Sequence, residues 1–127
     1  MTRLDGLQKA LLCTRAALDK KALDLVVIDV SGLTSIGDYL VICTGRSDRQ
    51  VQSIAQAVEE ALAAAGARPI SIEGIRRGQW VLLDSGDVIV HVFHQPIREF
   101  YDLERLWEHA PRVQLPEPLR SQASAGR

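Results

Sequence analysis

Two periods of apolar and polar residues run along the chain, and each predicts a type of secondary structure. Leucines and alanines at helical spacing near the N-terminus predict a first helix from about residue 4 to about residue 21. Runs rich in β-branched residues, Leu23 to Val30 and Tyr39 to Thr44, predict two strands. The loop between them is too short to hold a crossover helix, so these strands should be antiparallel.

A second helix should begin after Ser47, because Ser47 and Gln50 match the S-x-x-Q pattern of a capping box. Aliphatic residues then recur at helical spacing and predict the buried face of this helix: Val51, Ile54, Ala55, Val58 and Leu62. Gly66 is placed to end the helix in a left-handed conformation, and the segment from Ile70 to Glu73 predicts a short third strand.

The clearest hairpin pattern lies between two apolar runs, Trp80 to Asp84 and Asp87 to Phe93, which Ser85 and Gly86 separate. A two-residue loop there would pair three sets of residues: Asp84 with Asp87, Leu82 with Ile89, and Trp80 with His91. One face of this hairpin is purely aliphatic and should pack under helices. It carries Val81, Leu83, Val88, Val90 and Val92.

The opposite face of the hairpin mixes large apolar side chains with a charge and an imidazole. It carries Trp80, Leu82, Asp84, Ile89, His91 and Phe93. Aromatic groups ringed by polar ones are typical of a protein contact, so we predict that this mixed face binds a partner. The alternative is that a loop or the N-terminal helix of the chain itself covers the face, since most aromatic side chains are buried.

A last helix is predicted between Pro96 and Pro111. Its apolar side should be buried and carries Phe100, Leu103, Leu106 and Trp107. Its other side should face water, with Arg98 pairing with Asp102. The element order α, β, β, α, β, β, β, α predicts the α/β class: a mixed five-stranded sheet with flanking helices, most of them on the aliphatic face.

The chain has 127 residues, enough for one domain, predicted over residues 1–110, and too few for two. Three prolines, Pro111, Pro116 and Pro118, precede a polar ending, so residues 111–127 are predicted to form a disordered tail. The net charge is -1 and the basic residues are scattered along the sequence, so the charge pattern of a general nucleic-acid binder is missing. Direct binding of RNA is therefore disfavoured, and we expect no direct sequence-specific contact with nucleic acid. No stretch is long and apolar enough to cross a bilayer, so we expect no membrane partner and a cytoplasmic location.

Residue patterns that would support metal binding or nucleophilic catalysis are not recognisable. Cys13 and Cys43 lack ligand spacing and should be reduced, buried thiols. His91 and His94 point to opposite faces of one strand, so they cannot share a metal. No Ser or Cys stands in a nucleophile motif, although catalytic triads assemble in space and the sequence alone does not exclude one.

Gly45 and Ser47 stand between a strand and a helix, where backbone donors could bind a phosphate. Nucleotidyl transfer would also need two carboxylates on a neighbouring strand to hold magnesium, and Asp87 has no second acid beside it. The capping role accounts for Ser47 without a ligand. We therefore expect no enzyme and no cofactor, with a relic nucleotide site at Gly45 and Ser47 as the alternative.

Several motifs in the same order resemble the ribosomal silencing factor family, also called the iojap or RsfS family. They are DLVVIDVSGL, DYLVICTGRSDRQVQSIA, WVLLDSGDVIVHVFH and REFYDLERLW, and they span about Asp24 to Trp107. The resemblance implies an α/β fold related to nucleotidyltransferases but without their catalytic acids. It also implies a protein that binds protein fourteen of the large ribosomal subunit, blocks joining of the small subunit and represses translation when nutrients are scarce.

The family's WVLLD and FYDLERLW motifs fall on Trp80 to Asp84 and on Phe100 to Trp107. The predicted partner-binding residues are Glu73, Trp80, Leu82, Asp84, Ile89, His91, Pro96 and Tyr101. Glu73, Asp84 and Asp87 would frame the apolar residues with negative charge and so suit a basic ribosomal protein. A self-associating module is a rival interpretation, in which the same face meets its own copy across a two-fold axis.

Overall fold

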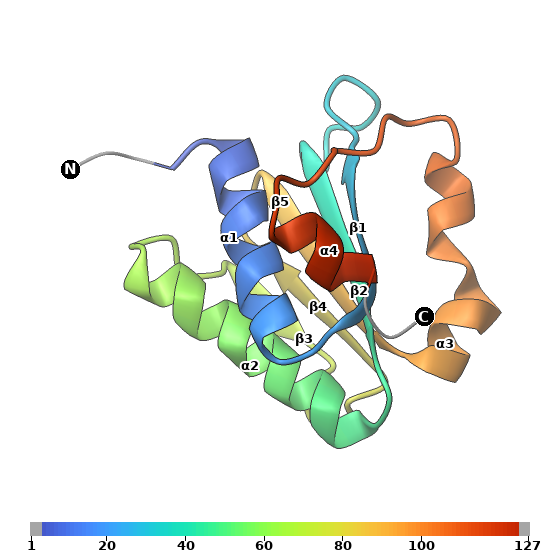
Figure 1. Cartoon of the computed structure of the whole chain (residues 1–127). Helices are drawn as coiled ribbons and strands as arrows, with labels where there is room; N and C mark the ends of the chain where they lie inside the picture. The colour runs from blue at the N-terminus through green and yellow to red at the C-terminus, as the bar shows by residue number, and fades with distance from the viewer. Residues whose placement is uncertain (1–3, 125–127) are drawn as a thin grey trace.

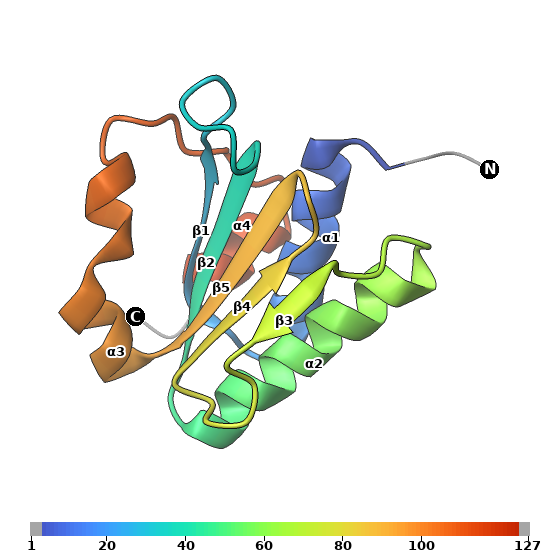
Figure 2. The same ribbon diagram turned by 180° about the vertical axis from the view of Figure 1, so that it is seen from behind.

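A five-stranded mixed sheet forms the centre of the computed structural model, which describes residues 4–124 (Figures 1 and 2). Its strands are β1 (Leu23–Asp29), β2 (Tyr39–Gly45), β3 (Ser71–Glu73), β4 (Trp80–Asp84) and β5 (Val88–His94). Their spatial order is β1-β2-β5-β4-β3, in which β2 and β5 are parallel and the other neighbours are antiparallel. The predicted α/β class, the mixed sheet and the antiparallel first pair are confirmed.

Helices cover the two faces of this sheet unequally. They are α1 (Gly6–Asp19), α2 (Asp48–Ala64), α3 (Gln95–Tyr101), the 3-10 helix η1 (Leu103–Trp107) and α4 (Leu119–Ser124). Three of them, α1, α2 and α4, lie against the aliphatic face, whereas α3 and η1 lie on the opposite side (Figures 1 and 2). The expected preference of the helices for the aliphatic face is confirmed.

Side chains at the helix starts satisfy backbone donors that have no partner within the helix. Ser47 Oγ accepts from the Gln50 backbone N at 3.1 Å, as predicted for the start of α2. The Gln50 side chain does not complete the capping box, because its Oε1 accepts from the Arg46 backbone N at 2.7 Å instead. A complete capping box stands at the start of α1, where Asp5 and Gln8 bond each other's backbone N at 2.7 and 3.0 Å.

The β4–β5 hairpin turns one residue later than predicted. The structure pairs three sets of residues: Trp80 with Phe93, Leu82 with His91, and Asp84 with Ile89. Each residue of β4 therefore pairs with a residue of β5 two positions later than predicted, so the predicted register is wrong. The backbone N of Ser85 donates to Val88 O at 3.0 Å, so Ser85 and Val88 close the turn. Gly86, with a φ of +89°, takes the first of its two central positions. Because a shift of two residues preserves the alternation, the two predicted faces are confirmed.

The predicted aliphatic residues of α2 and of the hairpin are all buried in one core, together with Cys13 and Cys43. Both cysteines are free thiols, and burial raises the pKa of each to about 12, so they stay protonated at neutral pH.

Gly45 is needed where β2 leads into α2, because a Cβ there would lie 2.8 Å from the Val51 side chain. This glycine lets the helix pack directly onto the strand.

The last helical segment is broken at Asp102, so the prediction of one continuous helix is wrong. Asp102 takes a left-handed conformation with a φ of 47° and a ψ of 50°, and η1 continues with a tighter helical period. Leu103 and Trp107 therefore pack against the sheet, while Phe100 and Leu106 are 79% and 75% exposed. Short polar residues tolerate this conformation better than most, which makes Asp102 a suitable break.

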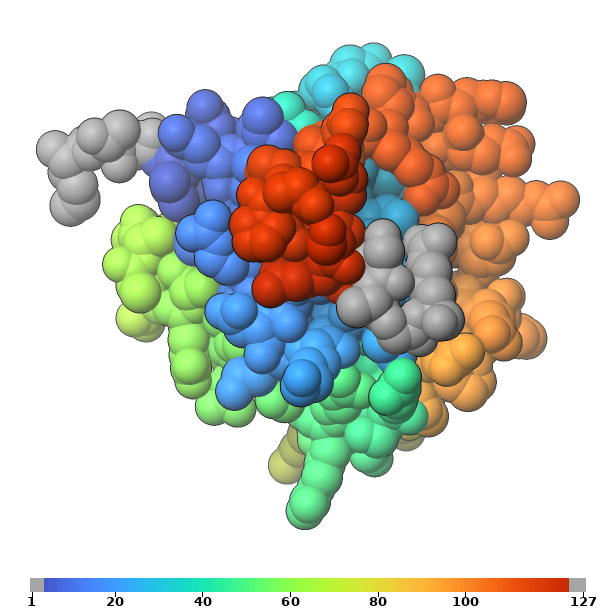
Figure 3. Space-filling view, in the orientation of Figure 1, coloured from blue at the N-terminus to red at the C-terminus, as the bar shows by residue number. Residues whose placement is uncertain are grey.

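Residues 111–124 are packed against the fold, which contradicts the prediction of a disordered tail for this segment. The Val113 backbone N donates to Val27 O at 2.8 Å, and the Asp29 backbone N donates to Pro111 O at 2.8 Å, so this segment lines the edge of β1. Figure 3 shows this segment lying against α1 on the surface of the molecule. Its apolar residues are buried between α1 and β1: Leu115, Leu119 and Ala123. Residues 125–127 of the predicted tail lie outside the described part of the chain.

Truncation of Leu119 to alanine should lower the free energy of unfolding by about 2 to 4 kcal/mol, because this buried side chain would leave a cavity between α4, α1 and β1. Urea denaturation followed by circular dichroism measures the change. Leu106→Ala is the matched control, since its exposed side chain should contribute less than ~0.5 kcal/mol. Equal stability of the two variants would contradict the packing of the C-terminal segment.

Candidate protein-binding site

The mixed face of the sheet is partly covered by the chain itself. A second core forms there from Ile28, Val30, Leu40, Ile42, Ile89, Phe93 and Ala110. Ile97 of α3, together with Leu103 and Trp107 of η1, packs against this core. The alternative of a cover from within the chain is thus confirmed for part of the face, with α3 and η1 in the place expected of the N-terminal helix.

Two of the predicted partner-binding residues lie beneath this cover. Ile89 is 5% exposed and His91 is 7% exposed, so neither side chain can meet a partner in this structure. The reason is that β5 lies inside the sheet and that α3, which follows it directly, folds back over its residues. The prediction that Ile89 and His91 contact a partner is therefore corrected.

The mixed face stays uncovered by helices over β4 and β3 (Figure 2). Six of the predicted partner-binding residues keep accessible surface: Glu73, Trp80, Leu82, Asp84, Pro96 and Tyr101. We call these six residues the docking face. Glu73 pairs with Leu82 across β3 and β4, which places the two side chains on the same side of the sheet. Pro96 and Tyr101 are exposed at the two ends of α3.

Trp80 is held in the docking face by aromatic neighbours. Its ring centroid lies 4.8 Å from that of Phe93 and 4.9 Å from that of Tyr101. Phe100 continues the series edge-on, with its centroid 5.1 Å from that of Tyr101. The rings thus lead from the buried Phe93 to the exposed Phe100, and between them the half-buried Trp80 and the exposed Tyr101 are held in a fixed geometry.

His91 orients Trp80 from beneath. The Trp80 Nε1–H donates to His91 Nδ1 at 3.0 Å, so the proton of the neutral imidazole must lie on Nε2. Burial lowers the pKa of His91 to about 4, which keeps the ring neutral at neutral pH. A proton on Nδ1 would remove the acceptor and end the bond to Trp80. His91 therefore acts as a positioning residue for Trp80.

Arg98 fastens α3 and η1 to the sheet. Its Nη1 donates to Asp24 O and to Thr44 Oγ1, both at 2.7 Å, which joins α3 to β1 and β2. Its Nε donates to Glu104 Oε1 at 2.9 Å, and this bond is the main reason why the pKa of Glu104 is lowered. The predicted pair of Arg98 with Asp102 on a solvated face is therefore wrong, because the guanidinium points inward.

The other residues considered for chemistry have structural roles in the described part of the chain. Gly45 allows close packing and Ser47 caps α2, as described above. His94 lies on the opposite side of β5 from His91, and its Nε2 is 3.2 Å from Arg46 O. Among residues 4–124, no group of three or more His, Cys, Asp or Glu side chains is placed to hold a metal ion.

The helices within residues 4–124 are each too short or too polar to cross a membrane.

Sequence reasoning missed two contributors to this site. It placed Phe100 on a buried stripe and Arg98 in solvent, whereas the structure exposes the ring and encloses most of the guanidinium. Both errors follow from the assumption of an unbroken helix. Asp102 was the available signal, because a short polar side chain often marks a left-handed residue.

The sequence profile of a family described as "Ribosomal silencing factor during starvation" matches residues 4–127. The ribosomal silencing factor RsfS of Bacillus subtilis is 43% identical over 110 residues, which cover 85% of this chain and 93% of that protein. The ribosomal silencing factor RsfS of Zymomonas mobilis is 45% identical over 96 residues, which cover 76% of this chain and 72% of that protein. The chloroplastic protein Iojap of Arabidopsis thaliana is 31% identical over 118 residues, 93% of this chain and 49% of that protein.

Two crystal structures share the fold. One, of a protein from Chromobacterium violaceum, has a TM-score of 0.81 and 37% identity, and covers 90% of this chain and 92% of its own. The other, of a protein from Bacillus halodurans, has a TM-score of 0.74 and 40% identity, and covers 83% of this chain and 95% of its own. Both solved structures are therefore similar to this chain in sequence as well as in fold.

The stability of the fold should fall as the pH drops from about 6.5 towards about 4, because the unfolded chain then binds a proton on His91 that the folded chain excludes. The contribution is fully present above pH 6.5 and is lost as the pH falls through the folded pKa. This lowering of the His91 pKa corresponds to a loss of about 3 kcal/mol in the free energy of unfolding. Urea denaturation at a series of pH values measures it.

The matched control is His91→Asn, whose side-chain oxygen can accept from Trp80 Nε1 but does not titrate in this range. The difference in unfolding free energy between wild type and this variant isolates His91 from the carboxylates. If that difference stays constant between pH 7 and pH 4, His91 is not the buried neutral imidazole described above.

Proposed function

The chain belongs to the ribosomal silencing factor family, and we propose that it binds protein fourteen of the large ribosomal subunit through the docking face. The bound protein would occupy surface that the small subunit needs, so the subunits could not join and translation would be repressed. We place this action in the cytoplasm, and we assign it to starvation because the description of the family names that condition. The observation that supports the proposal most is the uncovered aromatic area around Trp80.

The charges of the docking face suit a basic ribosomal protein. Glu73 is exposed and Asp84 is half-buried at its margin, so two carboxylates flank the apolar centre. Asp87, predicted as a third acid of this frame, is instead paired with Lys9 Nζ at 2.7 Å. This pairing ties the hairpin turn to α1. The acidic margin available to a partner therefore consists of Glu73 and Asp84.

The proposed action is regulatory and needs no catalytic group. Steric exclusion requires affinity and a body of sufficient size at the correct place on the large subunit. A contact of ordinary size buries ~800 Å² on each partner, with a few aromatic anchors supplying most of the binding energy. Trp80 and Tyr101 fit the anchor role, because both rings are held by neighbours before a partner arrives.

A second copy of the chain is the other occupant that this face would suit. Isologous contacts bury the same apolar patch on both subunits, and the docking face together with the exposed Phe100 offers such a patch. We propose that self-association, where it occurs, competes with the ribosomal partner for this surface. Light scattering with and without the large subunit would then report a dimer that disappears on binding.

Truncation of Trp80 to alanine should weaken binding to purified large subunits by about 2 to 4 kcal/mol, which is about thirty-fold to several-hundred-fold in Kd. The same variant should allow subunits to join in a sedimentation assay at a concentration at which the wild type prevents joining.

Tyr101→Ala is the second variant, because Trp80 also packs on Phe93 and its truncation affects the core as well. The Tyr101 ring is 55% exposed, so its loss should weaken binding by about 1 to 2 kcal/mol and leave the fold intact.

Leu33→Ala is the control, since Leu33 is also an exposed large hydrophobic residue but lies in the loop between β1 and β2, away from the docking face. It should bind as the wild type does. Thermal melts of all variants show whether each is folded at the assay temperature. Folded Trp80→Ala and Tyr101→Ala proteins with wild-type affinity would refute the docking face.

A further inference from the structure

The fold gathers at one end of the sheet basic residues that are scattered along the sequence. Six exposed cations lie at the end of α1, at the start of α2 and in the loop between β3 and β4: Lys20, Lys21, Arg46, Arg49, Arg76 and Arg77. We call these residues the basic pole. It is the lower end of the molecule in Figure 1, and Figure 3 shows the end of α1 against the start of α2 there.

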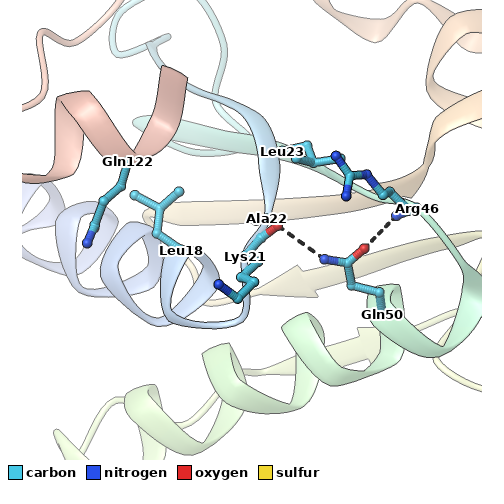
Figure 4. Close-up of a pocket in the computed structure, with 7 residues that line it drawn as sticks. All are labelled: Leu18, Lys21, Ala22, Leu23, Arg46, Gln50 and Gln122. Atoms are coloured by element: carbon cyan, nitrogen blue, oxygen red, sulfur yellow. Dashed lines mark hydrogen bonds between the residues drawn. The ribbon is translucent and has the colours of Figure 1, made fainter. Parts of the chain in front are cut away.

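Two glutamines of α2 tie the segments of the basic pole together. Gln50 Nε2 donates to Lys21 O at 3.1 Å, and its Oε1 accepts from the Arg46 backbone N (Figure 4). The same Nε2 also donates to Lys20 O at 3.3 Å. Gln52 Nε2 donates to the backbone oxygens of Ile75 and Arg76, both at 2.9 Å. The cations are therefore carried by turns whose relative positions are fixed.

The loop between β3 and β4 is also pressed against the first residue of α2. Gly78 has a φ of +64°, and a Cβ at this position would lie 2.5 Å from Asp48 O. Only glycine permits this approach together with this conformation. The contact brings Arg76 and Arg77 next to the turn that carries Arg46, so charges from distant parts of the chain become neighbours.

Positive charge is in excess at this end of the molecule. The acidic residues in or beside the same turns are Asp19, Asp24, Asp48 and Glu73, against the six cations of the basic pole. The opposite end of the sheet, at the β1–β2 loop and the β4–β5 turn, carries Asp29, Asp38 and Asp87, of which Asp87 is paired with Lys9. A net charge of -1 for the whole chain thus does not reveal that charge is unevenly distributed between these two ends.

We propose that the basic pole binds the phosphodiester backbone of RNA. Four of its six cations are arginines, whose planar guanidinium groups can bond phosphate oxygens in pairs. An open pocket of about 350 Å³, lined by Lys21, Arg46 and Gln50 among others, adjoins these side chains (Figure 4). Backbone recognition of this kind depends on charge and position, and it needs no sequence-specific motif.

The composition of the basic pole favours RNA over an acidic protein or an anionic membrane. Ile75, at 36% exposure, is the large exposed hydrophobic residue found within the three segments that form the pole. A stable protein contact needs a larger apolar centre, and a membrane-binding helix needs an apolar face to insert. Neither is present in the described part of this end of the molecule.

The basic pole adjoins the docking face. Glu73 ends β3 and Trp80 begins β4, and the loop that carries Arg76 and Arg77 joins these two residues. The inference goes beyond the proposed function by giving this protein a second, electrostatic contact. Because ribosomal proteins sit among RNA helices, a chain docked on one of them through Trp80 would hold the basic pole against neighbouring phosphates.

The test compares two triple variants that each remove three positive charges. Arg49, Arg76 and Arg77 are replaced by glutamine in the first, and Arg15, Arg68 and Arg120, which are exposed outside the basic pole, are replaced by glutamine in the second. Fluorescence anisotropy with a short fluorescein-labelled RNA duplex gives Kd between about 50 and about 200 mM salt. The same titrations are repeated with purified large ribosomal subunits.

The first variant should bind the RNA duplex at least about tenfold more weakly, and its slope of log affinity against log salt should be smaller by about 2 to 3. The control variant should match the wild type. Equal loss in both variants would mean that only net charge matters and would overturn the proposal. Wild-type binding to polyglutamate or to phosphatidylglycerol vesicles as tight as binding to RNA would overturn it as well.

The outcome for subunit joining separates this inference from the proposed function. A saturating amount of the first variant should still prevent subunits from joining, because its docking face is intact. If the wild type itself does not prevent joining, the proposed function fails, whereas the RNA measurement still decides the role of the basic pole.

Discussion

The two central strands, β2 and β5, must be buried on both faces, and this requirement shapes the rest of the fold. Their parallel pairing sets two apolar runs side by side, with valines towards one face of β5 and Ile89, His91 and Phe93 towards the other. The helices α1, α2 and α4 close the aliphatic face. The other face is closed only as far as α3 and η1 reach. The docking face exists because this second cover does not extend over β4 and β3.

The position of the second cover is fixed by polar bonds as well as by apolar packing. Arg98 bonds β1, β2 and η1 at once, so α3 cannot slide along the sheet without leaving a guanidinium and the Glu104 carboxylate without partners. Since α3 also carries Tyr101, the same bonds hold that ring against Trp80. His91 restrains Trp80 from below. A surface held in this way loses little conformational entropy when a partner binds.

Features that depend on neighbours in the sequence could be predicted, and features that depend on distant contacts could not. Local sequence patterns predict the N-cap at Ser47, the left-handed residue Gly66 at the end of α2 and the two faces of the hairpin. The structure confirms all three. The break at Asp102 and the packed C-terminal segment depend on what Arg98 and Leu119 meet across the sheet. Periodicity shows that a residue belongs to an apolar face, but it does not show which segment covers that face. This is why six of the eight predicted contact residues are accessible while Ile89 and His91 are not.

Charge is a second property that only the fold arranges. Read along the sequence, the lysines, arginines and acids are mixed, whereas in space the turns at one end of the sheet collect cations and those at the other end collect aspartates. A separation of charge over a small body produces a field that orients the molecule as it approaches a charged particle. The cationic end adjoins Trp80, so attraction to phosphate would bring the apolar docking face forward rather than the aspartate-rich end. Orientation by charge and affinity from aromatic rings would then act in sequence, the first speeding the encounter and the second prolonging the bound state.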